Sequence, residues 1–348
     1  MAYNGAVEDF RTIRQSGTPK QVPCVAQSEE FDVKWYGKYC YEELCQSGNK
    51  IFEVWSAAIR EFDYDWAWVQ IDDCLEFEPL GIKCIGQDNI LRATHGTLPA
   101  GKGLDLLKKL DPFTAGRMPE KLKAIRLLRE KFGDTVLITG SCAAPFSAIG
   151  LMWGIQESMM MIYDDPELLR ESMLIWKDFY MRYLKAQQEA GAHAIWFGDC
   201  NAFSGLLSVA QYEEHILDIT RELVQYAEKE LDLMIWMHNS EIQVKHVLSH
   251  LPLGVSFESI GPAADIAEIR QATKGKQAIS GNLDPIEVLW RGTPESIAAE
   301  VKRIMSICKD GGGYIFATGE MNPYQAPVEN MRTMMQTAKS IANLTGAK

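Results

Sequence analysis

The chain has no long uninterrupted run of apolar residues, although 47% of its 348 residues are hydrophobic. A membrane-spanning helix needs roughly 18 or more such residues in succession, and the longest apolar stretches here are interrupted by Asp, Lys, Gly or His. Positive charge is also scarce, since 35 Lys and Arg stand against 47 Asp and Glu, for a formal net charge of −12. Nucleic acids and anionic membranes attract clustered positive charge, so we expect neither as a partner.

Several short motifs are missing as well. The eight cysteines form no C-x-x-C pair, and the opening stretch MAYNGAVEDFRTIRQ lacks the basic-then-apolar layout of a secretion signal. We therefore expect reduced thiols in a cytoplasmic protein. The phosphate-binding patterns G-x-x-x-x-G-K-[S/T] and G-x-G-x-x-G and the G-x-S-x-G pattern of serine hydrolases are also absent. These absences argue against a nucleotide-phosphate loop and against a nucleophile elbow.

What the sequence does contain is an alternation of short β-rich segments with longer helical patterns. Near-continuous apolar runs are typical of strands buried on both faces. The predicted strands span residues 21–27, 67–73, 135–141, 194–199, 233–238, 254–259, 277–282 and 313–319. This pattern predicts an α/β fold, a (β/α)8 TIM barrel that forms a single domain over residues 1–348 with an N-terminal extension over 1–20. The stretch 74–134 exceeds one crossover and predicts an insertion after the second strand, with extra helices or a lid.

Three helices carry clear start and stop signals. The segment 164–192 has Pro166 early and Gly191 at its end, and the segment 208–230 begins at Ser208, a candidate N-cap. The segment 293–313 begins with Thr293 as a candidate cap and Pro294 at the first helical position.

Polar side chains end nearly every predicted strand. In a barrel, such residues meet at the carboxyl-terminal face, where active sites are built. A single polar strand end is usually a cap or a turn residue, but their number here favours a pocket with converging ligands. The strand-end residues are Asp72, Asp73, Ser141, Cys142, Asp199, Cys200, His238, Asn239, Ser240, Glu258, Asn282, Asp284 and Glu320.

A divalent metal site suits this set best. His238, Glu258, Glu320 and Cys200 are zinc-compatible ligands from different strands. The alternatives remain a hydrogen-bonded histidine at the rim of the core for His238 and an inert buried thiol for Cys200. Asp199 is a catalytic candidate that would orient either the substrate or a ligand imidazole.

Aromatic residues form the second feature of the predicted strands, and most of them are expected to pack in the core. Phe203 and Tyr324 follow strand ends and are therefore candidates for a substrate-binding wall around an apolar or aromatic compound. Asn282, at the end of the seventh predicted strand, is the polar candidate for substrate binding.

Four stretches resemble the uroporphyrinogen decarboxylase superfamily. LITGSCAAPFSAIGLMWG resembles its third-strand signature, and DWAWVQIDDCLEFEPLGI resembles its second strand, with Asp72 on the position of a catalytic Asp. ISGNLDPIEVL resembles the family's QGNLDP stretch, and YIFATGEMNPYQAPVENMRTMM resembles its last strand and helix. The resemblance covers nearly the whole chain and implies a (β/α)8 barrel.

Departures from the family pattern imply which branch the chain resembles. The decarboxylases carry an arginine-rich segment after strand 1, whereas PCVAQSEEFDVKWYGKY here is acidic and has no arginine, so we reject decarboxylation of a substrate with many carboxylates. The resemblance points instead to the corrinoid-dependent methyltransferases, whose thiol-methylating members hold zinc with a His-x-Cys after strand 5 and a Cys after strand 8. Here His238 matches the His, Ser240 replaces the first Cys, Glu320 replaces the second, and Glu258 matches an acidic residue after strand 6.

An oxygen-richer site suits polarisation of an oxygen more than activation of a thiol. The resemblance therefore implies a zinc-dependent O-demethylase component that moves a methyl group from a methoxylated aromatic compound to cobalt. The cobalamin would belong to a separate corrinoid protein, and a homodimer is compatible with the sequence. Two alternatives stay open: methyl transfer from methylcobalamin to another acceptor, and a porphyrinoid-binding protein without catalysis. Another methyl donor, such as a methylated amine or methanol, also stays open.

Overall fold

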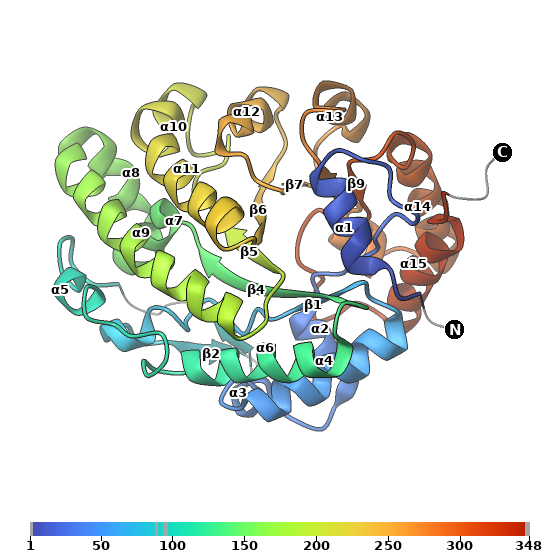
Figure 1. Cartoon of the computed structure of the whole chain (residues 1–348), viewed down its shortest axis with the longest axis horizontal. Helices are drawn as coiled ribbons and strands as arrows, with labels where there is room; N and C mark the ends of the chain where they lie inside the picture. The colour runs from blue at the N-terminus through green and yellow to red at the C-terminus, as the bar shows by residue number, and fades with distance from the viewer. Residues whose placement is uncertain (1–2, 88–89, 93–96, 345–348) are drawn as a thin grey trace.

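The computed structural model describes residues 3–87, 90–92 and 97–344, and of the segment 85–96 only the backbone of the described residues. Its main sheet has seven parallel strands in the order β1-β4-β5-β6-β7-β8-β9 (Figure 1). Each strand of this sheet after β1 therefore lies beside the sheet strand that precedes it along the chain. The strands are β1 Trp66–Trp68, β4 Leu137–Ala143, β5 Ala194–Gly198, β6 Met234–Glu241, β7 Phe257–Ile260, β8 Ile279–Ser280 and β9 Tyr314–Ile315. Parallel neighbours joined through helices and curled into a barrel confirm the predicted TIM barrel fold.

The segment 21–27 closes the ring between β9 and β1, although it was predicted as a regular strand. The Val25 N–H donates to the Phe316 carbonyl at 3.0 Å, and the Asp65 N–H donates to the Cys24 carbonyl at 3.0 Å. The segment forms two isolated bridges, a parallel one from Cys24 to Phe316 and an antiparallel one from Gln21 to Asn343. Pro23 has no N–H to offer a ladder, so the eighth strand is reduced to bridging contacts.

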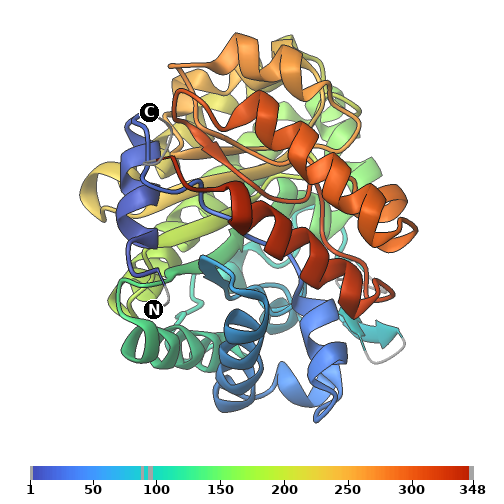
Figure 2. The same ribbon diagram turned by 90° about the vertical axis from the view of Figure 1, so that its right-hand side faces the viewer.

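The helices surround the barrel, and Figure 2 shows α14 and α15 side by side on its outside. The α-helices are α1 Ala6–Arg14, α2 Glu29–Tyr36, α3 Tyr41–Leu44, α4 Gly48–Phe62, α5 Leu104–Leu107, α6 Met118–Phe132, α7 Pro145–Trp153, α8 Ile155–Asp164, α9 Pro166–Glu189, α10 Val209–His215, α11 Leu217–Gln225, α12 Val244–Ser249, α13 Ile266–Thr273, α14 Pro294–Cys308 and α15 Val328–Ile341. Shorter 3-10 or π turns cover Glu78–Leu80, Tyr226–Glu230, Leu251–Leu253 and Pro285–Trp290.

The predicted cap residues begin their helices. Ser208 accepts a hydrogen bond from the Gln211 N–H, and the Gln211 side chain bonds back to the Ser208 N–H, which makes a capping box at α10. Thr293 forms the same kind of box with Ser296 at α14, with Pro294 at the first helical position. These local signals were therefore sufficient to place both helix starts.

The N-terminal extension contributes α1, whose buried Phe10 packs into the barrel. Its ring lies 5.8 Å from Phe257 and 6.2 Å from Trp236, between the centroids. The insertion after the second predicted strand follows β1 and contains the antiparallel hairpin β2 Ile85–Gln87 and β3 Ile90–Arg92, then α5 and α6.

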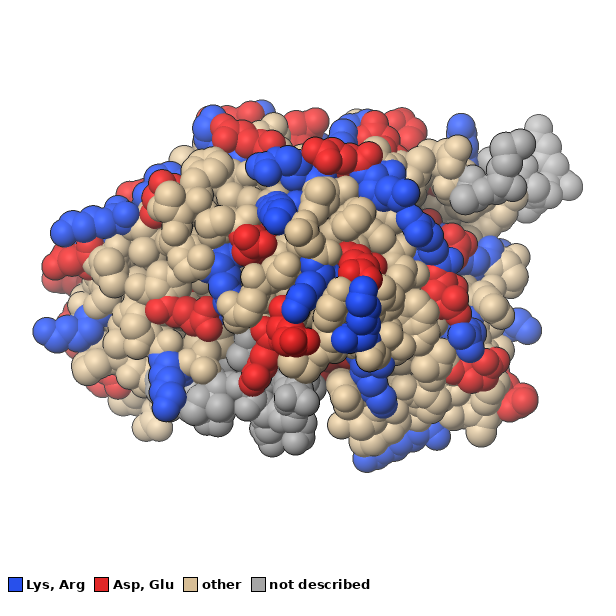
Figure 3. All heavy atoms as spheres, turned by 90° about the horizontal axis from the view of Figure 1, so that it is seen from below, with Lys and Arg blue, Asp and Glu red and all other residues tan. Residues whose placement is uncertain are grey.

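The surface carries both signs of charge. On the face seen in Figure 3, Lys and Arg are interspersed with Asp and Glu, without a large patch of one sign. Within the described residues, no helix combines the length and hydropathy that crossing a bilayer requires.

Candidate functional site

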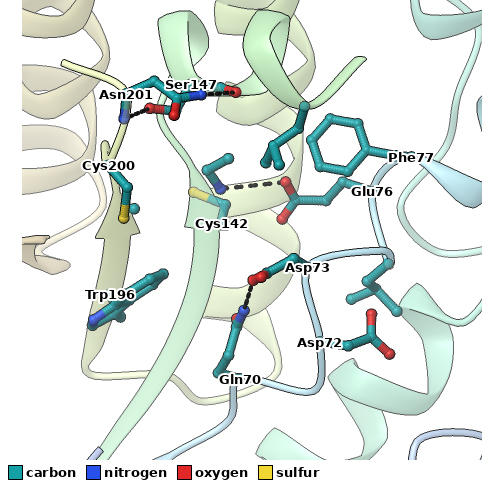
Figure 4. A pocket seen from close by; sticks show the side chains of 14 residues that line it. Gln70, Asp72, Asp73, Glu76, Phe77, Cys142, Ser147, Trp196, Cys200 and Asn201 are labelled. Atoms are coloured by element: carbon teal, nitrogen blue, oxygen red, sulfur yellow. Dashed lines mark hydrogen bonds between the residues drawn. The ribbon is translucent and has the colours of Figure 1, made fainter. Parts of the chain in front are cut away.

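A pocket opens at the carboxyl-terminal ends of β1, β4 and β5 (Figure 4). This is the end at which barrel active sites are built. Its described lining consists of Gln70, Asp72, Asp73, Leu75, Glu76, Phe77, Cys142, Ala143, Ser147, Leu151, Trp196, Gly198, Cys200 and Asn201. The lining thus includes residues with three carboxylates and two thiols beside aromatic and aliphatic side chains, and neither Lys nor Arg belongs to this described lining.

Asp72, predicted as catalytic, lies in the pocket wall but is held by an arginine. Arg117 donates to its two carboxylate oxygens at 2.6 and 3.1 Å, and both side chains are almost fully buried. Arg117 also bonds Glu78 at 2.8 Å, which ties α6 to the segment after β1. A two-pronged bond of this kind fixes the orientation of the carboxylate. Figure 4 shows Asp72 on the side of the pocket away from Cys142 and Cys200.

Glu76 lies deeper in the pocket. Its Oε2 accepts from the Tyr180 hydroxyl at 2.8 Å and from the Ala143 N–H at 3.3 Å. Only 6% of the residue is exposed, and this burial raises the pKa of the carboxyl to about 7, although the nearby Lys121 ammonium and the two hydrogen bonds oppose the rise. Glu76 can therefore hold or release a proton near neutral pH.

A second buried network supports the floor of the pocket. Lys121 donates to the Ser141 carbonyl at 2.7 Å and to its hydroxyl at 2.5 Å, and Ser141 donates to Gln70 at 2.5 Å. Gln70 in turn donates to Asp73 at 3.0 Å. Burial lowers the pKa of Lys121 to about 8, partly offset by Glu76.

His238 lies at the end of a row of aromatic rings that contact one another at tilted angles. The ring centroids of Trp236 and Trp66 are 4.8 Å apart, and those of Trp68 and Trp196 are 5.3 Å apart. The centroid of the His238 ring lies 4.7 Å from that of Trp196. Since Trp196 lines the pocket, it separates the pocket from His238 by one ring. The aromatic residues of β1, β5 and β6 thus pack in the core, as expected, and also orient the imidazole.

His238, Ser240 and Glu320 form one cluster. The His238 Nε2 lies 3.5 Å from a Glu320 oxygen and 3.3 Å from the Ser240 hydroxyl, which itself bonds the other Glu320 oxygen. Although burial opposes ionisation, His238 and Ser240 lower the pKa of Glu320 to about 2. The cluster therefore holds a fixed negative charge above β6, next to an imidazole.

Glu258 lies on the other side of the sheet from His238. It pairs in register with Met237, and because neighbouring side chains on a strand alternate, it faces outward while His238 faces the barrel interior. There it bonds the His250 Nδ1 at 2.8 Å. Cys200 borders the pocket, with its sulfur 3.9 Å from the His238 carbonyl oxygen.

The four predicted zinc ligands are thus only partly brought together. His238 and Glu320 are neighbours, and Glu258 faces the other side of the sheet. The Cys200 sulfur lies beside the His238 carbonyl oxygen. Over residues 3–87, 90–92 and 97–344, no three His, Cys, Asp or Glu side chains are arranged to hold a metal ion. Protein zinc sites use at least three protein ligands, so the donors in this arrangement do not fit one.

The remaining candidates lie outside the described lining of the pocket. Asp199 accepts from the Ser147 hydroxyl at 2.8 Å, and burial raises the pKa of its carboxyl to about 6. Asn282 donates to the Gly261 and Ala264 carbonyls at 3.1 and 3.0 Å, which fastens the loop after β7. Tyr324 packs under Lys34, whose ammonium is 4.8 Å from the ring centroid. The Phe203 carbonyl accepts from the Leu206 N–H in the loop after β5.

Comparison with known proteins places this architecture in a family. The family model for uroporphyrinogen decarboxylase (URO-D) matches residues 10–341. The chain belongs to the URO-D family. This confirms the superfamily resemblance seen in the sequence, and the match includes every strand of the barrel.

Relatives within this family differ in their activities. The methylcobamide:CoM methyltransferase MtbA of Methanosarcina mazei is 30% identical over 243 residues, which cover 69% of each chain. The uroporphyrinogen decarboxylase of Dechloromonas aromatica is 24% identical over 314 residues, 87% of this chain and 86% of that one. A solved methyltransferase from Methanosarcina mazei superposes with a TM-score of 0.84 at 17% identity, covering 96% of this chain and 98% of that one, which supports the fold.

Glu76 and Trp196 are among the pocket residues that the strand-end argument missed. Glu76 lies beyond the end of β1, within DDCLEFEP, and Trp196 lies inside β5. The only sequence signal for Glu76 was the acidic character of that segment. Its position in the pocket depends on the chain turning back toward β4, which no local pattern encodes.

Proposed function

We propose that this chain is a methyltransferase that moves a methyl group from a methyl ether, specifically a methoxylated aromatic compound, to the cobalt of a separate corrinoid protein. Membership of the URO-D family and similarity to proteins named methylcobamide:CoM and methylated-thiol–coenzyme M methyltransferase support methyl transfer. The ether is the more specific part of the proposal. It rests on the chemistry of the pocket and of the His238–Ser240–Glu320 cluster.

The observation that carries the proposal is the lining of the pocket. Carboxylates of Asp72, Asp73 and Glu76 line it, and its described lining offers no Lys or Arg. A substrate with many carboxylates would find no Lys or Arg to pair with in this described lining, which argues against decarboxylation of such a substrate. Trp196 and Phe77 give the pocket aromatic surface that suits a flat, uncharged ring.

In the proposed step, Co(I) of the partner corrinoid attacks the methyl carbon with its electron pair. A Co–C bond forms, the C–O bond breaks, and the oxygen keeps the bonding pair and needs a proton. Ser240 and Glu320 occupy the positions at which the thiol-methylating relatives described above keep cysteines, so an oxygen-bearing donor suits this mouth better than a thiol. Zinc remains a prediction from the sequence, and we derive no step from it because the described donors do not fit one.

A direct test combines the chain with a reduced corrinoid protein and a panel of methoxyarenes. We expect the absorption of Co(I) to change to that of methyl-Co(III) with at least one ether, and no change when the chain is omitted. Turnover with methylated amines and with no ether would overturn the ether assignment.

The second candidate is methyl transfer from methylcobalamin to another acceptor, which the names of the relatives favour. In that direction the chain would consume methylcobalamin in the presence of a thiol. If the chain consumed methylcobalamin with a thiol faster than it formed methyl-Co(III) from any ether, this candidate would be favoured over the first.

A further inference from the structure

Glu76 is a buried acid that forms no ion pair with a Lys, Arg or His side chain among the described residues, although the charge of Lys121 acts on it. Its Oε2 is occupied by the Tyr180 hydroxyl and the Ala143 N–H, and neither bond uses Oε1. The carboxyl group lines the pocket, and Figure 4 shows it facing the space beside Cys142. One oxygen is thus anchored, while the other lies on the pocket side of the group.

The anchor is rigid. Tyr180 is fully buried on α9, and its ring stacks on Trp176 at 5.2 Å between centroids. Burial raises the pKa of the Tyr180 hydroxyl well above its ordinary value, so it stays a neutral donor. The nearest buried cation, Lys121, directs its ammonium to the carbonyl and hydroxyl of Ser141.

On the basis of the proposed function, we propose that Glu76 is the acid that protonates the oxygen released when the methyl group moves to cobalt. As the C–O bond breaks, its bonding pair remains on the oxygen, and the proton of Glu76 Oε1 transfers to that oxygen. The products are a phenol and the Glu76 carboxylate, which regains its proton from water. No other reactant is required besides the Co(I) named above.

Two other acids of the pocket, Asp72 and Cys142, are less suited to this role. Both oxygens of Asp72 are engaged by the two-pronged bond from Arg117, so neither is left to contact a ligand. Burial raises the pKa of the Cys142 thiol well above its ordinary value, so the thiol is a poor proton donor. Burial instead brings the pKa of Glu76 to about 7, where an acid is effective at neutral pH.

Leaving-group dependence in Glu76→Gln tests the assignment. Gln keeps an oxygen that accepts from Tyr180 and Ala143 but has no acidic proton. With methoxyarenes whose phenols are weak acids, we expect the variant to lose about 100-fold or more in rate. With a nitro-substituted methoxyarene, whose phenolate leaves without a proton, the loss should be under about 10-fold. The activity of the wild type should also fall as the pH rises through about 7, because Glu76 loses its proton there. The pH profile of Glu76→Gln should lack this fall.

Controls and contrary outcomes separate this proposal from the proposed function. Glu42→Gln makes the same change at an exposed position and should match the wild type, and Glu76→Asp should recover part of the loss. If Glu76→Gln lost the same factor in rate with every ether, or if its pH profile matched that of the wild type, Glu76 would not be the proton donor. Methyl transfer itself would remain supported in either case.

A readout independent of turnover is the infrared band of a protonated carboxyl group. We expect a band that is absent in Glu76→Gln and that shifts when a phenol binds the wild type. If the phenol left the Glu76 band unchanged, Glu76 would not contact the phenol oxygen, even in an enzyme that is active. A wild type that demethylates no ether would overturn the proposed function, and the phenol-induced shift would still decide whether Glu76 contacts the ligand oxygen.

Discussion

At the scale of single residues, Ser240 is the position at which this chain departs from the His-x-Cys pattern that the sequence resemblance implies for thiol-methylating enzymes. Its hydroxyl bonds Glu320 and lies 3.3 Å from the His238 imidazole. A sulfur at this position would offer a metal ligand, whereas the hydroxyl acts as a hydrogen-bond donor that keeps Glu320 ionised. The result is a cluster with two zinc-compatible donors instead of three.

The sequence-based zinc hypothesis therefore has a direct test. It predicts about one zinc ion per purified wild-type chain, lost in His238→Ala and weakened in Glu320→Gln with the fold retained. Elemental analysis after dialysis measures the content, with the exposed Glu42→Gln as control. A wild-type chain that neither retains nor takes up zinc would contradict the hypothesis. If the wild type retained zinc, the side chain of Glu258 or Cys200 would have to move to complete the ligand set of His238 and Glu320.

Asp32, buried on α2, predicts a pH dependence of stability. Burial raises its pKa from the ordinary 3.8 to about 8, although bonds with Ser28 and Tyr64 oppose the rise. Between these values the folded chain holds a proton that the unfolded chain has lost, so this contribution to stability is complete below about pH 4 and is lost as the pH rises to about 8.

Asp32→Asn should remove this dependence. We expect the unfolding free energy of the wild type, minus that of the variant, to fall by more than about 2 kcal/mol across this window. Urea unfolding at several pH values measures the difference, and the exposed Asp164→Asn should show no such slope. A constant difference between wild type and Asp32→Asn would contradict a raised pKa.

At the scale of elements, α1 and the insertion after β1 are the two parts added to the barrel. Phe10 of α1 packs against Trp236 and Phe257 inside the strands. Arg117, at the start of α6, joins the insertion to the end of β1 through Asp72. Phe10 and Arg117 each contribute to one of these attachments, and the removal of either side chain should lower the free energy of unfolding for a different physical reason.

Phe10→Ala should lower the unfolding free energy by about 3–5 kcal/mol, because the removed ring leaves a cavity between fully buried neighbours. Urea unfolding followed by tryptophan fluorescence measures this loss. Glu8→Ala on the exposed face of the same helix should change stability by less than about 0.5 kcal/mol. A loss of similar size in both variants would show that α1 acts through its helix as a whole.

Arg117→Met should cost about 3–5 kcal/mol, because it leaves the buried Asp72 carboxylate without its partner. Asp72→Asn in the same chain should recover part of that loss, since the double variant no longer buries an unpaired charge. A double-mutant cycle by urea unfolding measures the coupling. Additive effects would mean that the two side chains do not stabilise each other.

At the scale of the whole molecule, the barrel, α1 and the insertion share buried core residues from Val7 to Ala342. Such continuity predicts that the chain unfolds as the single domain expected from the sequence. Calorimetry should give one transition whose calorimetric and van't Hoff enthalpies agree. Two separable transitions would contradict a single domain.

Much of the fold could be predicted because its signals are local. Apolar runs gave the strands, and Ser208, Thr293 and Pro294 gave helix starts that the structure reproduces. The segment 21–27 was the exception, since Pro23 and its neighbours form bridges instead of a regular strand. The residues at the strand ends also predicted which residue types lie at the mouth of the barrel.

Tertiary structure alone decided how those residues meet. Glu258 faces away from His238 because β7 pairs with β6 in a register that sets it opposite Met237, and a strand's own alternation does not fix its phase relative to a neighbour. Arg117 reaches Asp72 across 45 positions of sequence, and Tyr180 reaches Glu76 across 104. The sequence by itself determined a barrel with an acidic, aromatic mouth. The long-range contacts decided that Asp72 is bound by an arginine and that Glu76 faces the pocket without a paired cation.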